Sequence, residues 1–97
     1  MLSQKEYIEI GLNGDAPLKV ILKGGVEHHT NENIGVVSLV YATMNREAAK
    51  QKLAELMKHD EKSYYMVYSV PLELDLTTLN HYPSVAITKA DLSSQTF

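Results

Sequence analysis

The sequence predicts an α+β fold in two layers, with one main helix packed on a mostly antiparallel sheet of four to five strands. Three features carry this prediction: apolar residues that alternate near the N-terminus, a helical stripe within residues 45–58, and a tyrosine-rich segment over residues 63–70. Alternation with period two is typical of a half-buried strand, and spacing by three and four is typical of a helix that buries one face. The expected order is strand, strand, third strand, helix, strand, short helical turn, strand.

The length and composition of the chain suit one domain. Its 97 residues are 44% hydrophobic and 22% charged, which is ordinary for a globular protein. A chain of this length can bury one modest core. We therefore expect a single domain over residues 1–97, with a polar tail over residues 93–97 that frays.

Alternation predicts the first two strands. In residues 7–12 the even-numbered residues are apolar and would share one face of a strand. In residues 18–23 the even-numbered apolar residues would point inward, and Lys19 and Lys23 would point outward. The Asn-Gly pair within residues 13–17 accepts positive φ readily, so this segment suits a hairpin turn between the two strands.

The middle of the chain is less decisive. We expect the glycine pair at residues 24–25 to end the second strand, and the polar residues 26–33 to form an exposed loop, with a short strand near Val26–His28 left open as an alternative. Residues 34–42 are rich in valine, and their β-branched content favours a buried strand. A helix over residues 34–42 stays open as an alternative, because the polar residues just before it could cap one.

The main helix has the clearest signals. Thr43 or Asn45 can cap it by accepting hydrogen bonds from its first free N–H groups. Its apolar stripe consists of Ala49, Leu53, Leu56 and Met57. Lys58 and His59 suit the negative end of the helix dipole.

The last third of the chain predicts two more strands around a short helical turn. Residues 63–70 read as a strand that ends at Pro71, since proline has no N–H to donate to a sheet. Asp75 can cap a short helical turn that Pro83 ends. Residues 84–88 predict a last short strand.

We expect this fold to leave a contact surface open. A single helix covers only part of such a sheet, and a second copy of the chain could cover the rest. The chain has six tyrosines but one phenylalanine and no tryptophan, and tyrosine suits half-exposed contact surfaces. Tyr64 and Tyr68 share one face of their strand and Tyr65 lies on the other, so these three residues mark the expected region of contact.

The composition excludes several classes of function. With no cysteine there are no disulfides, thiolate metal sites or thiol nucleophiles. The formal net charge of −3 and the lack of a basic block argue against a nucleic-acid partner. The longest apolar stretch, residues 34–42, is too short to cross a membrane, and the first residues do not resemble a signal peptide. We expect a cytoplasmic protein that uses no cofactor and contacts neither nucleic acid nor membrane.

The histidines give two further candidate sites. His28 and His29 lie near carboxylates and could bind a metal, but neighbours in an extended chain point to opposite sides, so exposed loop histidines are the simpler expectation. His81 and Tyr82 follow the capped turn, where a ring can be held rigidly. No strained nucleophile turn of the G-x-S-x-G kind accompanies them, so a packed Tyr82 beside Pro83 explains the segment without catalysis.

A resemblance covers about the last third of the chain. The run from Tyr64 to Leu72, with Asp75-Leu76-Thr77 and the segment from His81 to Lys89, resembles small uncharacterised proteins of Gram-positive bacteria, of the domain-of-unknown-function kind. The resemblance implies a stand-alone cytoplasmic bacterial protein. It implies no activity and no site residues.

These features predict a small non-enzymatic interaction protein that forms a homodimer. One alternative is a small hydrolase or metal-dependent enzyme that uses the histidines. Another is a module that binds a small molecule between helix and sheet.

Overall fold

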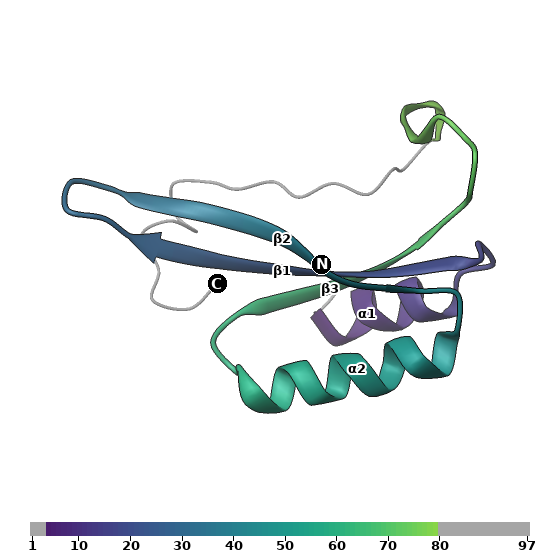
Figure 1. Ribbon diagram of the computed structural model, residues 1–97, viewed down its shortest axis with the longest axis horizontal. Helices are drawn as coiled ribbons and strands as arrows, with labels where there is room; N and C mark the ends of the chain where they lie inside the picture. Colours follow the sequence, from purple (N-terminus) through teal and green to yellow (C-terminus); the bar gives the residue numbers. More distant parts are fainter. Residues whose placement is uncertain (1–3, 80–97) are drawn as a thin grey trace.

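The computed structural model describes residues 4–79 of the chain. In order, its elements are α1 (Gln4–Asn13), β1 (Leu18–His28), β2 (Asn33–Thr43), α2 (Arg46–His59), β3 (Tyr64–Val70) and the 3-10 turn η1 (Leu76–Thr78). The three strands form an antiparallel sheet in the order β2-β1-β3. Both helices lie against one face of this sheet (Figure 1). The α+β prediction is therefore confirmed, with two helices rather than one.

The N-terminal segment is a helix, so the strand predicted over residues 7–12 is wrong. Ile8 and Leu12 lie four residues apart and are buried, whereas Ile10 between them is 60% exposed. The segment suits a helix as well as a strand, because an alternating segment also contains residues four apart and the polar residues here are good helix formers. Residues 13–17 consequently join a helix to a strand and do not form the predicted hairpin turn.

Helix α1 lies very close to β3 because Gly11 has no side chain. A Cβ atom on Gly11 would overlap the carbonyl oxygen of Val67 and lie 3.1 Å from the Val67 Cβ. At Gly14 an added Cβ would lie 2.7 Å from the Cβ of Ser69. These two glycines therefore set the distance between α1 and the sheet.

Strand β1 presents its odd-numbered residues to the helices, the reverse of the prediction. Ile21 is fully buried, and Lys19 is 5% exposed. The Lys19 Nζ donates hydrogen bonds to the Gly14 carbonyl at 2.6 Å, the Ala16 carbonyl at 3.0 Å and the Ser69 Oγ at 2.6 Å. The Ser69 hydroxyl in turn donates to the Gly11 carbonyl. Lys19 thus uses all three of its N–H donors beside the negative end of α1, which is why it can point inward.

Strands β1 and β2 form a long hairpin. Strand β1 continues through the glycine pair to His28, so the predicted break there is wrong. Residues 34–42 are a strand, which resolves the alternative left open by the sequence. The register shifts where Ile21 pairs with Tyr41 and Leu22 with Leu39, so Val40 is the extra residue of a β-bulge.

The remaining elements follow the sequence prediction. Asn45 caps α2, its side chain accepting a hydrogen bond from the Ala48 N–H at 3.0 Å. Asp75 caps η1 by accepting from the Thr77 N–H at 3.0 Å. The core joins both helices to β1 and β3 through Ile8, Leu12, Ile21, Ala49, Leu53, Tyr65 and Val67.

The described part of the sheet has three strands, fewer than the four to five predicted. The strand predicted over residues 84–88 and the tail over residues 93–97 lie outside the described residues. Within residues 4–79, neither helix has the length and apolar character that a membrane crossing requires.

Replacing Gly11 by alanine tests the close approach of α1. The change would favour an isolated helix by up to ~1 kcal/mol. In this protein we expect a net destabilisation of about 2 kcal/mol, because the new methyl group forces α1 away from β3. Urea unfolding measures the difference. Gly25→Ala is the control, since among residues 4–79 an added Cβ there meets only the Ser63 Oγ at 3.8 Å; equal effects of the two changes would contradict the packing argument.

Lys19→Met tests the buried ammonium group. We expect a loss of about 2 kcal/mol of unfolding free energy, because methionine keeps the apolar stem but leaves the carbonyl acceptors without their donor. Lys58→Met, at an exposed position of α2, should change the unfolding free energy by less than about 0.5 kcal/mol. If both variants unfold at the wild-type urea concentration, the hydrogen bonds of Lys19 do not stabilise the fold.

Candidate functional site

The candidate site is the face of the sheet opposite the two helices, called here the open face. Successive residues of a strand point to opposite faces, and Ile21, Tyr65 and Val67 enter the core on the helix side. Their neighbours along the strands, together with the residues paired with those neighbours, therefore form the open face: Leu18, Val20, Leu22, Val37, Leu39, Ala42, Tyr64, Met66, Tyr68 and Val70. None of these residues is charged.

Exposure on the open face increases towards β2. Met66 and Val70 of β3 are 8% and 9% exposed, whereas Val37 and Leu39 of β2 are 37% and 60% exposed. Leu22 of the central strand pairs with Met66 on one side and Leu39 on the other. The apolar surface is therefore continuous across the strands, and its most accessible part lies on β2.

The three tyrosines predicted to mark a contact region divide between the two faces. Tyr65 is 1% exposed in the helix-side core, so its side chain is not available for contact. Tyr64 and Tyr68 are half-buried on the open face. Burial raises the pKa of Tyr64, and the neighbouring Tyr7 and Tyr68 raise it further. The Tyr68 hydroxyl donates a hydrogen bond to the Met66 sulfur at 3.8 Å.

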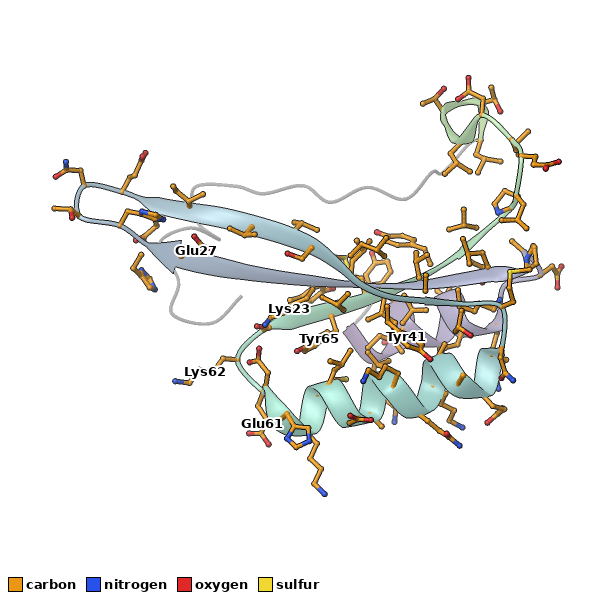
Figure 2. The ribbon with its side chains drawn as sticks, in the orientation of Figure 1. Lys23, Glu27, Tyr41, Glu61, Lys62 and Tyr65 are labelled. Atoms are coloured by element: carbon orange, nitrogen blue, oxygen red, sulfur yellow. The ribbon has the colours of Figure 1, made fainter. Side chains whose placement is uncertain are left out.

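A charged cluster joins the end of α2 to β1 on the helix side (Figure 2). The Asp60 carboxylate lies 3.0 Å from the Lys23 Nζ and accepts a hydrogen bond from the Ser63 hydroxyl at 2.8 Å. The hydrogen bond from Lys23, followed by that from Ser63, lowers the pKa of Asp60 to about 2. The same pair raises the pKa of Lys23.

Tyr65 also belongs to this cluster. Burial raises the pKa of its hydroxyl, and the negative charge of Asp60 adds to the effect. The two charges of Lys23 and Asp60 satisfy each other in this arrangement. The cluster therefore acts as a tie between the loop after α2 and the sheet, and it presents no activated acid or base.

The histidine candidates lie at the far end of the β1–β2 hairpin. The His28 Nδ1 is 2.9 Å from the Asn33 Oδ1, and the His29 Nε2 is 3.4 Å from the Glu27 Oε1. All four side chains of these two contacts reach the solvent at or near the hairpin tip. Among residues 4–79 no three histidine, aspartate or glutamate side chains come together as a metal site would require. His81 and Tyr82 lie outside the described residues.

Residues 4–79 line two grooves on the helix side. One, of about 590 Å³, runs under the β1–β2 hairpin; Figure 2 labels Lys23, Glu27 and Lys62 among its lining residues. The other, of about 490 Å³, lies between α1 and α2. Its floor is apolar, with Leu53 and Met57 contributing, and the side chains of Lys5 and Lys50 line it as well.

The sequence prediction missed the contribution of β2 to the open face. It placed the contact on the tyrosine-rich strand, although among the described elements β2 carries the largest number of exposed large apolar side chains. A signal was present in the sequence: Asn33–Thr43 contains no charged residue and no proline over eleven residues. Such a segment is a candidate for contact on both of its faces.

Comparison of the chain with protein-family models, with curated proteins and with solved structures finds no match. No relative therefore supplies a function or a site residue.

The pKa of Asp60 predicts how stability depends on pH. Its folded value of about 2 is below the ordinary 3.8, so its charge stabilises the folded state above pH 3.8 and this contribution is lost as the pH falls towards 2. Asp60→Asn keeps one acceptor oxygen but removes the charge. We expect the variant to melt at a lower temperature than the wild type near neutral pH, and the gap to close in acid.

Circular dichroism melts across this pH range measure the effect. Glu61→Gln is the control, because it removes a neighbouring exposed carboxylate and should give no comparable gap. A gap for Asp60→Asn that is the same at every pH would contradict the assignment to the Lys23–Asp60 pair.

Proposed function

We propose that this chain is a small non-enzymatic protein-interaction module that forms a homodimer in the cytoplasm. One observation carries the proposal: the open face bears only uncharged side chains, with Leu39 60% exposed, while both helices pack on the other face. The cysteine-free composition supports the cytoplasmic location. The resemblance of the last third of the chain to small proteins of Gram-positive bacteria is compatible with such a module.

A second copy is a suitable partner on grounds of charge and burial. The net charge of −3 would repel two copies if it lay at their contact, but the open face carries none of it. Burying apolar surface contributes roughly 25 cal/mol per Å². A twofold contact uses the same patch on both copies, so every apolar side chain in the contact is buried once in each copy and contributes to the buried apolar area twice.

Binding of a small molecule is the second candidate function. The groove of about 490 Å³ between α1 and α2 favours it, since the floor is apolar and two lysines line it. A small apolar carboxylate fits this chemistry. A thermal-shift screen with such acids tests the idea: a ligand at 100 times its dissociation constant adds about 2.7 kcal/mol of stability.

Leu39→Asp tests the homodimer. We expect wild-type protein to scatter light as a dimer at micromolar concentration, and the variant to dimerise at least about tenfold more weakly, because the charge must be desolvated on binding. Ile10→Asp is the matched control, since Ile10 is also 60% exposed but lies on α1. A wild type that stays monomeric, or equal effects of the two changes, would contradict the proposal.

A further inference from the structure

We propose that the outer edge of β2 pairs with the same edge of a second copy, so that two three-stranded sheets join into one. This inference rests on the proposed homodimer and identifies which part of the surface forms it. In this inference the contact between the two copies lies along β2, at the most exposed border of the open face, and not at the centre of that face.

The distribution of exposed apolar side chains favours an edge over a face. Four of the large hydrophobic residues exposed in the structure lie on β2: Ile34 at 38%, Val37 at 37%, Leu39 at 60% and Val40 at 37%. Val37 and Leu39 belong to the open face. Ile34 pairs with Glu27 on the helix side, and Val40 lines the groove there. A partner on the open face would cover only Val37 and Leu39. A strand beside β2 would contact these two side chains and also Ile34 and Val40 on the helix side.

No strand within residues 4–79 lies along the outer edge of β2. Its other edge pairs with β1. Natural sheets usually protect such an edge with charged residues or proline, because its N–H and C=O groups otherwise recruit another strand. Strand β2 has neither over its eleven residues, so its sequence does not oppose pairing.

The same composition favours a second copy as the occupant. An antiparallel pair about a twofold axis places β2 opposite itself, and a charge close to the axis would then lie near its equivalent on the other copy. The absence of charge removes this repulsion. It also gives a charged partner segment no complementary residue on β2. Valine and isoleucine, which are frequent here, pack well across paired strands.

The β-bulge limits the register of the pair. A bulge bends its strand and disrupts regular pairing, and Val40 is the extra residue here. The regular part of β2 is therefore residues 33–39, and its centre is Val36. We place the twofold axis at Val36, so that Ser38 of one copy lies opposite Ile34 of the other.

Ser38→Glu tests the edge without altering the open face. Ser38 is exposed and pairs with Lys23 on the helix side, so a glutamate there suits the fold but must lose water at the edge. We expect the dissociation constant of the dimer, measured by analytical ultracentrifugation, to rise at least about tenfold. Ser38→Thr is the matched control and should stay dimeric, as should Tyr68→Ser, which changes the open face on β3.

The other outcomes separate the inference from the proposed function. If Tyr68→Ser dissociates the dimer and Ser38→Glu does not, the edge inference is wrong and the homodimer stands. If wild-type protein is monomeric throughout, both fail. A monomer whose β2 amides still exchange slowly at the outer edge would also overturn the inference, because another segment of the same chain would then occupy that edge.

Cysteine cross-linking provides a second measurement, since the chain has no cysteine of its own. Val36→Cys should form a disulfide-linked dimer on oxidation, because residues at the axis of an antiparallel pair lie within disulfide range. Tyr68→Cys, on β3, should not. Cross-linking through residue 68 alone would overturn the edge inference.

Discussion

The close approach of α1 to β3 is the constraint on which the rest of the structure depends. Gly11 allows the helix backbone to reach the backbone of Val67, and the hydroxyl of Ser69 then bonds to the Gly11 carbonyl. This contact places α1 on the same side of the sheet as α2, and both helices contribute to one core. Within residues 4–79 no helix lies on the other side of the sheet, which is the open face.

The buried side chain of Lys19 joins the turn after α1 to β3 through its hydrogen bonds. Its ammonium group needs three acceptors when buried, and the turn after α1 together with Ser69 provides them. Once Lys19 points inward, the alternation of the strand sends Leu18, Val20 and Leu22 outward. The burial of one cation at the end of α1 is therefore linked directly to the apolar character of the opposite face.

Accessible surface without charge is distributed unevenly over the described residues. On the helix side Lys23 is paired with Asp60, and His28 and His29 lie at the hairpin tip. Apolar exposure concentrates on β2, on both of its faces. This distribution suits recognition of another strand better than chemistry on a small substrate, and it relates the proposed dimer to the edge of the sheet.

Local signals in the sequence determined α2, β3 and η1, because caps such as Asn45 and Asp75 act over a few residues. The β-branched run of β2 favoured a strand, but the sequence left a helix open there and the structure resolved the choice. The alternation in residues 18–23 also determined that Leu18, Val20 and Leu22 share one face of the sheet. Only the tertiary structure decided that residues 4–13 are a helix, that Lys19 points inward and that Tyr65 is buried. The alternation of Ile8, Ile10 and Leu12 is compatible with a strand and with a helix. The close packing of Gly11 against β3 decides in favour of the helix. The direction of Lys19 likewise depends on acceptors up to fifty residues away in the chain, which become its neighbours only after folding.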